Sequence, residues 1–95
     1  MTTDASQSAT EAAIFNRVIA PERASLEPEA ARAFLGLDFQ PEDQERMRLL
    51  AAKAADGKLT PDEEVEIESY NRVGHILALL QSKARLSLKN AGLAR

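Results

Sequence analysis

The side chains that could do chemistry in this chain are few, and the first candidate is an acidic cluster. Asp62, Glu63, Glu64, Glu66 and Glu68 lie close together, and Glu64 and Glu68 share one face at helical spacing. Such carboxylates can bind a divalent cation, but no histidine lies at the Glu-x-x-His spacing of dinuclear carboxylate bundles. A solvated helix start is the better interpretation, so we expect no metal site.

A second candidate is the segment from Asp56 to Glu63, which superficially resembles a calcium-binding loop. When Gly57 is placed at position six of such a loop, Glu63 falls at position twelve, as calcium requires. Positions one and three are then Ala52 and Ala54, which have no carboxylate oxygen to offer. The segment therefore predicts a turn between two helices rather than a calcium site.

The single histidine, His75, follows Gly74. The sequence places no serine, cysteine or carboxylate as a catalytic partner for its imidazole. The plain interpretation is a packed or surface histidine. The alternative is a close helix crossing, where the glycine admits another backbone and the imidazole makes a specific hydrogen bond. Because a nucleophile, a base and a cofactor-binding loop are all missing, we expect neither an enzyme nor a bound cofactor.

Two groups of basic side chains remain. Arg17 and Arg23 could bind carboxylates or phosphates, although surface charge is the simpler interpretation because no glycine-rich loop accompanies them. Lys83, Arg85 and Lys89 form a basic rim near the C-terminus, which suits the negative end of a helix dipole. Contact with an acidic partner or with phosphates is the alternative. Base stacking is disfavoured because no aromatic residue is interleaved with the rim.

The composition limits the class of protein. The chain has 95 residues, 44% of them apolar, which suits one small domain. It contains no cysteine, so disulfides and thiolate chemistry are excluded. No apolar run approaches the ~18 residues of a membrane span, and the first residues lack the pattern of a signal peptide. We therefore expect a cytoplasmic protein that does not enter a membrane.

Charge is divided unevenly along the chain. Residues 1–40 carry a net charge of −3, residues 41–68 carry −5 and residues 69–95 carry +5. The acidic balance disfavours a general nucleic-acid binder. The basic C-terminal third nevertheless keeps a DNA-associated regulator as an alternative.

Prolines and apolar spacing predict an all-α fold, a helical hairpin with a long C-terminal helix plus one or two short N-terminal helices. Residues 1–9 are expected to be a disordered lead-in, and residues 10–95 a single small helical domain. A first helix over 10–20 is indicated by the capping-box spacing of Ser8 and Glu11, although its β-forming residues leave an extended arm as the alternative. A short helix over 28–35 ends at Gly36.

The hairpin itself is predicted from residues between 55 and 61 that end one helix and start the next. Gly57 can end a helix, and Thr60 with Glu63 forms a capping box around Pro61 at the first helical position. The helix before this turn runs over 41–55. Its inward stripe is predicted to contain Met47, Leu50, Ala51 and Ala54.

The last helix, over 61–89, carries one apolar stripe: Val65, Ser69, Val73, Ile76, Leu77, Leu80, Ala84 and Leu88. Its length of ~43 Å exceeds the ~22 Å of its neighbour, so the neighbour covers it only to about Ile76. We expect a partner to bind the remainder: His75, Ile76, Leu77, Leu80, Ala84 and Leu88. The alternative is self-burial, with the overhang covered by Phe15, Ile19, Phe34 and Leu35.

Four sequence segments resemble a family of small, uncharacterised bacterial helical proteins. They are Leu-x-Pro-Glu-Ala-Ala-Arg at 26–32, Leu-x-Phe-x-x-x-Asp-x-x-Arg-Met at 37–47, Gly-x-Leu-Thr-Pro at 57–61 and Val-Gly-His-x-x-Ala-Leu-Leu-Gln-Ser-Lys-Ala-Arg at 73–85. The resemblance covers about residues 14–90. Because genes of this family can lie beside toxin or HNH-nuclease genes, it implies a bacterial accessory or antitoxin-like role. Glu27 departs from the serine that this family carries before Pro28.

These patterns together favour a non-enzymatic protein-interaction module that binds a partner through the apolar face of its long C-terminal helix. The antitoxin-like or nuclease-accessory role is the specific version of this hypothesis. One alternative is a homo-oligomeric structural protein, such as a homodimer, that buries the same face against itself. The other is a DNA-associated regulator that uses the basic C-terminal end.

Overall fold

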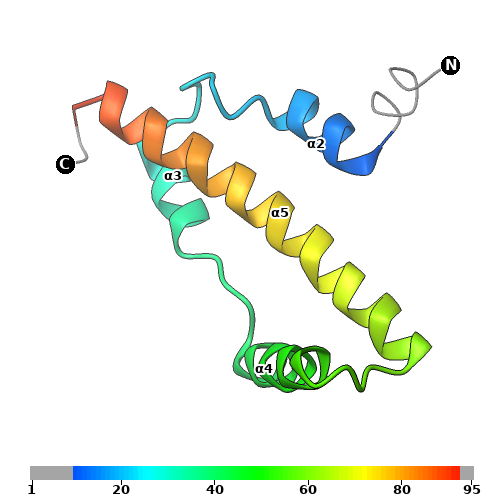
Figure 1. The fold of residues 1–95 in the computed structure, drawn as a ribbon. Helices are drawn as coiled ribbons and strands as arrows, with labels where there is room; N and C mark the ends of the chain where they lie inside the picture. Colours follow the sequence, from blue (N-terminus) through cyan, green and yellow to red (C-terminus); the bar gives the residue numbers. More distant parts are fainter. Residues whose placement is uncertain (1–9, 93–95) are drawn as a thin grey trace, which may run out of the picture. The chain divides into compact units, whose positions relative to one another are not determined.

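The computed structural model describes residues 10–92, and every regular element in that range is a helix (Figure 1). The four helices are α2 (Glu11–Ile19), α3 (Pro28–Leu35), α4 (Pro41–Ala55) and α5 (Pro61–Asn90). The predicted all-α fold with a long C-terminal helix is thereby confirmed. The lead-in predicted for residues 1–9 lies outside the described residues.

The chain forms two compact units. Among the described residues, the terminal unit combines residues 10–37 with residues 75–92. The hairpin unit comprises Asp38–Gly74, that is, α4 and the first half of α5. The single domain predicted over 10–95 stays a prediction.

The first described helix begins at a different residue from the one predicted. Thr10 is the N-cap of α2, and its Oγ1 accepts a hydrogen bond from the Ala13 amide at 3.1 Å. The predicted cap, Ser8, lies outside the described residues. The segment is helical rather than extended, because its start is capped and Pro21 limits only its end.

The turn between α4 and α5 follows the prediction. Gly57 has a φ of 67°, which suits glycine, and the Lys58 amide donates to the Lys53 carbonyl at 2.9 Å to close the end of α4. At the start of α5, the Thr60 amide donates to Glu63 Oε1 at 3.0 Å, and the Glu63 amide donates to Thr60 Oγ1 at 3.1 Å. The predicted capping box is therefore confirmed.

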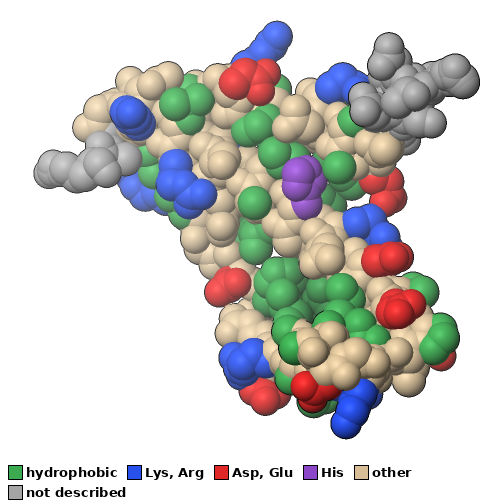
Figure 2. Space-filling model, in the orientation of Figure 1, with side chains coloured by type: hydrophobic (Ala, Val, Ile, Leu, Met, Phe, Trp, Pro, Cys, Tyr) green, Lys and Arg blue, Asp and Glu red, His purple; other side chains and the backbone are tan. Residues whose placement is uncertain are grey.

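Leu50 is the one fully buried residue that the structure shows in the hairpin unit, with 1% of its surface exposed. Met47 is half-buried, and Ala51 is exposed but lines a pocket with Ile67 and Tyr70 of α5. Ala54 is exposed, so the predicted inward stripe is wrong at this alanine. In Figure 2, apolar side chains accordingly gather at the surface beside α4.

The terminal unit is built around two alanines. Ala31 of α3 and Ala84 of α5 have no exposed surface, and Leu88 retains 6%. Leu26, Phe34 and Leu35 are partly buried and pack against this cluster. Since alanine projects little beyond the backbone, the two helices can approach closely at this point.

Polar side chains of α5 complete the terminal unit by binding main-chain groups of the N-terminal segment. Ser87 is 3% exposed, and its Oγ accepts a hydrogen bond from the Leu26 amide at 3.1 Å. The Gln81 amide nitrogen donates to the Phe34 and Leu37 carbonyls at 3.2 and 2.8 Å. The carbonyl groups at the end of α3 thus find partners on another helix.

Replacing Leu50 with alanine tests the hairpin core. We expect Leu50→Ala to lower the free energy of unfolding by about 2–5 kcal/mol, since it removes buried methyl groups and leaves a cavity. Leu49→Ala is the matched control, because Leu49 is 51% exposed, and it should change the value by less than about 0.5 kcal/mol. Urea denaturation measures both. Equal losses in the two variants would contradict the assigned core.

Candidate functional site

Ion pairs between α4 and α5 position the candidate site. The guanidinium of Arg46 donates to both carboxylate oxygens of Glu66, with Nε–Oε2 and Nη2–Oε1 distances of 2.7 Å each. Two turns along α4, the Lys53 ammonium donates to Glu63 Oε2 at 2.6 Å. These contacts hold the face of α5 that carries Glu63 and Glu66 against α4. The bidentate geometry of Arg46 adds directionality that a single ion pair lacks.

The same contacts change the protonation behaviour of the paired groups. The hydrogen bond from Arg46 lowers the pKa of Glu66, and the bond from Glu66 raises the pKa of Arg46. The hydrogen bond from Lys53, helped by the Thr60 amide, lowers the pKa of Glu63. These carboxylates therefore stay ionised to a lower pH than free glutamates. Both pairs are partly exposed, so water and salt weaken them.

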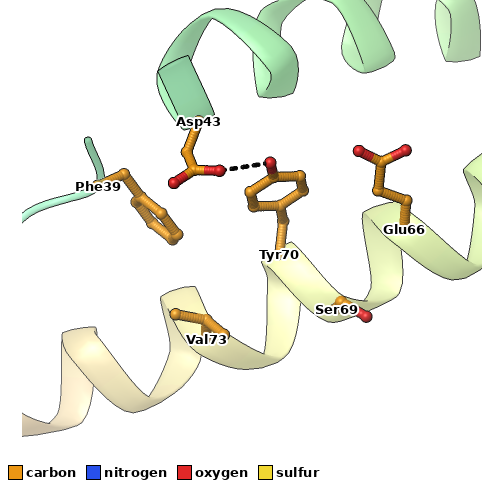
Figure 3. Close-up of a pocket in the computed structure, with 6 residues that line it drawn as sticks. All are labelled: Phe39, Asp43, Glu66, Ser69, Tyr70 and Val73. Carbon is orange, nitrogen blue, oxygen red and sulfur yellow. Dashed lines mark hydrogen bonds between the residues drawn. The ribbon is translucent and has the colours of Figure 1, made fainter. Parts of the chain in front are cut away.

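Tyr70 lies one turn beyond Glu66 on α5 and meets the first turn of α4. Its hydroxyl donates to Asp43 Oδ1 at 2.7 Å, and this bond raises the pKa of the phenol. The ring contacts Phe39 in a T-shaped arrangement with a centroid distance of 6.0 Å (Figure 3). Tyr70 is thus fixed at both its hydroxyl and its ring.

An open pocket of about 360 Å³ surrounds this tyrosine (Figure 3). Its lining residues come from α5, from the first turn of α4 and from the segment before it: Phe39, Asp43, Glu66, Ser69, Tyr70 and Val73. Glu66 uses both oxygens on Arg46, whereas Asp43 Oδ2 accepts no hydrogen bond from the residues of 10–92. The pocket combines aromatic surface with one available carboxylate oxygen. This chemistry suits a basic side chain.

The surface around the pocket is both apolar and acidic. Val73, in the pocket wall, is 51% exposed, and Val65, two turns earlier on α5, is 60% exposed. Ser69 lies between them on the same stripe. Residues 38–74 contain ten acidic and five basic side chains, a net charge of −5.

The residues predicted to contact a partner fall into three classes of exposure. His75 is exposed (purple in Figure 2), and the next three members are half-buried: Ile76, Leu77 and Leu80. Ala84 and Leu88 are buried in the core of the terminal unit. At these last two positions the chain covers its own apolar face, as the self-burial alternative proposes. Ala84 and Leu88 are therefore not available as a docking surface.

Exposure along the predicted stripe of α5 runs opposite to the expectation. Val65 and Val73, which were expected to lie under α4, are 60% and 51% exposed, whereas Ala84 and Leu88 at the expected overhang are buried. The face that meets α4 instead carries Glu63, Glu66 and Tyr70, as their hydrogen bonds show. Ion pairing and ring packing, rather than apolar spacing alone, select that face.

Sequence reasoning missed this site, although a signal for it exists. Asp43, Arg46 and Lys53 follow helical spacing along α4, and their partners Tyr70, Glu66 and Glu63 follow it in reverse order along α5. A search for complementary side chains across an antiparallel helix pair would have matched all three. Apolar spacing alone does not reveal this pairing.

The basic rim divides between two environments. The Lys83 ammonium donates to the Ile19 carbonyl at 2.7 Å, so this side chain belongs to the terminal unit's own packing. Arg85 and Lys89 are exposed. The rim predicted from the sequence is therefore not one continuous free surface.

The close helix crossing suggested for Gly74 is wrong for the hairpin unit. Helix α5 runs unbroken through Gly74, and an added Cβ there would meet a single atom within 4 Å, Phe39 Cζ at 3.9 Å. That distance is an ordinary van der Waals contact. The glycine is therefore not required by a neighbouring backbone.

The chain matches no protein-family model, and comparisons with curated proteins and with solved structures find no match either. Over residues 10–92, no three His, Asp or Glu side chains are grouped so that they could hold a metal ion. Within the same range, no helix has both the length and the apolarity needed to cross a membrane.

Substituting Gly74 tests the helix directly. We expect Gly74→Ala to raise the free energy of unfolding by about 1 kcal/mol, because alanine is the better helix former and the added methyl group has space. The reverse change at an exposed position of the same helix, Ala78→Gly, should lower it by a similar amount. Thermal and urea unfolding report both values. A loss of stability in Gly74→Ala would show that the methyl group clashes.

The ion pairs predict a pH dependence with a definite sign. Because the folded pKa values of Glu63 and Glu66 are lowered below the unfolded value of about 4.3, their stabilisation is complete above that pH and is lost as the pH falls through the folded values. The free energy of unfolding should therefore decline below about pH 4.

A pair of variants separates this effect from general acid unfolding. Arg46→Gln should flatten the acid dependence measured by urea unfolding between pH 3 and pH 6. Arg48→Gln is the control, because its partner Glu45 is a highly exposed neighbour on the same helix. If both variants keep the wild-type slope, the Arg46–Glu66 pair does not control the acid response.

Proposed function

We propose that the protein is a non-enzymatic protein-interaction module whose hairpin unit binds a basic segment of a partner protein. The observation that carries this proposal is the open pocket around Tyr70, which places aromatic rings and an available carboxylate oxygen beside exposed valines. The proposed partner-binding surface therefore lies at residues 65–73 of α5, whereas the sequence predicted it at the C-terminal end of this helix.

The size of the hairpin core supports a bound partner. The unit spans 37 residues (Asp38–Gly74), and units below about 40 residues usually need additional stabilisation from disulfides, metals or association. The chain has no cysteine, and Leu50 is the one fully buried residue among 38–74. Covering Val65 and Val73 would remove further apolar surface from water, which is favourable at roughly 25 cal/mol per Å².

The chemistry of the pocket supports a basic partner. A lysine or arginine side chain can place its aliphatic stem against Phe39 and Val73 while its charged end reaches Asp43 Oδ2. The aromatic rings add a favourable interaction with a cation. An acidic side chain in the same place would meet Asp43 and Glu66, and like charges repel.

The net charge of the hairpin unit supports an antitoxin-like or nuclease-accessory role. Proteins that cut or bind nucleic acids carry basic surfaces for the phosphate backbone, and a unit with a net charge of −5 complements such a surface. The resemblance to bacterial proteins encoded beside toxin or HNH-nuclease genes points the same way. An antitoxin-like or nuclease-accessory role in the cytoplasm is therefore the form of the proposal that we favour.

Self-association is the second candidate, and the charge distribution favours one geometry for it. Two hairpin units of net charge −5 would repel each other in a symmetric contact. The described residues of the terminal unit, 10–37 and 75–92, contain six basic and four acidic side chains, a net charge of +2. A head-to-tail contact between unlike units of two copies would be the complementary arrangement.

Introducing a positive charge in the pocket wall tests the proposal. The protein is purified from its native host with its bound partner, the partner is identified, and calorimetry measures its affinity for Val73→Lys and for wild type. We expect at least a tenfold weaker affinity, because the lysine adds a cation to a surface that receives basic side chains. Val18→Lys is the control, because Val18 is 75% exposed on α2, outside the pocket, and its affinity should be unchanged.

Two outcomes would contradict the proposed role. Equal partner affinity for both variants would exclude the pocket as the binding surface. Concentration-dependent self-association in sedimentation, lost in Val73→Lys and kept in Val18→Lys, would favour the homo-oligomeric candidate instead. Circular dichroism of each variant verifies that the helices are intact.

A further inference from the structure

We propose that the pocket around Tyr70 selects a dimethylated lysine side chain of the partner segment over an unmodified lysine. The proposal rests on the proposed function, because it names the cation that the same pocket receives. The side chains of Phe39, Asp43 and Tyr70 point toward one another there (Figure 3). The number of hydrogen-bond acceptors and the arrangement of the rings together define the cation that fits.

The rings of Phe39 and Tyr70 form an aromatic corner. Their centroids lie 6.0 Å apart and their planes meet at 63°. A group bound in such a corner can touch the faces of both rings, and ring faces attract cations. Methyl groups on an ammonium nitrogen spread its positive charge over C–H groups and add apolar surface. The corner therefore favours a methylated ammonium over one that is surrounded only by N–H groups.

Most polar atoms of the pocket already have hydrogen-bond partners. Both carboxylate oxygens of Glu66 accept from Arg46 at 2.7 Å. The Ser69 hydroxyl donates to a main-chain carbonyl of its own helix at 3.3 Å and accepts from an arginine one turn later at 3.2 Å. Asp43 Oδ1 accepts from the Tyr70 hydroxyl at 2.7 Å, which leaves Oδ2 without a hydrogen bond from residues 10–92. The pocket thus presents one ready carboxylate oxygen beside aromatic and apolar surface.

The donors of the ligand have to match this single acceptor. An unmodified lysine ammonium has three N–H donors and a guanidinium has five, so most of them would lose water without gaining a partner. A dimethylated lysine is still a cation, keeps one N–H for Asp43 Oδ2 and can turn its methyl groups toward the two rings. A trimethylated lysine has no N–H and loses the bond to Asp43. The dimethylated form therefore matches both features of the pocket.

A methylation series of one small probe tests this selectivity on the intact chain. N-acetyl-lysine methylamide with zero, one, two or three methyl groups on Nζ is titrated at constant ionic strength, and N-acetyl-arginine methylamide serves for comparison. Amide chemical shifts report each affinity. We expect saturable shifts at residues 39–43 and 66–73, with the dimethylated probe binding about three- to fivefold more tightly than the unmethylated one.

Two variants separate the contributions of the carboxylate and the ring. Asp43→Asn keeps an oxygen for the Tyr70 hydroxyl but removes the negative charge, so the dimethylated probe should lose more affinity than the trimethylated one. Phe39→Leu keeps apolar bulk but removes a ring, so the preference for methylated probes should disappear. Glu42→Gln is the control, because Glu42 is an exposed carboxylate of the same first turn of α4 outside the pocket. It should leave the order of affinities unchanged.

The outcomes distinguish this selectivity from the proposed function. Equal or tighter binding of the unmethylated lysine or of the arginine probe would overturn the selectivity and leave the basic partner supported. Tightest binding of the trimethylated probe would overturn it too, since the N–H would then have no role. No saturable binding of any probe would contradict both the selectivity and the cation pocket. An unchanged order of affinities in Asp43→Asn and Phe39→Leu would place binding outside the pocket and would likewise overturn the selectivity.

Discussion

The bidentate ion pair between Arg46 and Glu66 fixes which face of α5 lies against α4. Helix α5 carries apolar residues around much of its circumference, so hydrophobic burial alone permits several orientations. Bidentate pairing requires both helices to present their side chains in one register, and the Lys53–Glu63 and Tyr70–Asp43 contacts continue that register along the interface. Val65 and Val73 then remain at the surface, and the pocket beside Tyr70 opens next to them. The candidate site is thus a direct consequence of the polar contacts that orient the helix.

Both units have small cores, and different contacts stabilise them. The terminal unit brings two alanines together and ties main-chain groups of the N-terminal segment to Gln81, Lys83 and Ser87 of α5. Such hydrogen bonds are individually worth about 0.5–1.5 kcal/mol, but each also satisfies a main-chain group or a buried hydroxyl. The hairpin unit buries one leucine and joins its helices by partly exposed ion pairs and by the contacts of Tyr70 with Phe39 and Asp43. Its remaining apolar surface is what a partner protein would cover.

The pockets of the two units differ in the charge of the residues that line them. The acidic hairpin unit offers an aromatic pocket with a carboxylate, whereas the terminal unit gathers three basic side chains around a turn. The pocket of the hairpin unit is the one that carries the proposed contact with a cationic protein segment. Both pockets combine residues of α5 with residues of preceding elements.

The sequence by itself determined the helices and their ends. The predicted spans 28–35, 41–55 and 61–89 agree with α3, α4 and α5 to within one residue, because prolines, Gly57 and the Thr60–Glu63 box act over a few neighbouring positions. Only the tertiary structure decided which faces are covered. The burial of Ala84 and Leu88 and the exposure of Val65 and Val73 depend on contacts with α3 and α4, whose partners are 20 to 60 residues away. Local propensity carries no information about such pairings, and apolar spacing alone does not distinguish the competing faces of a helix as broadly apolar as α5.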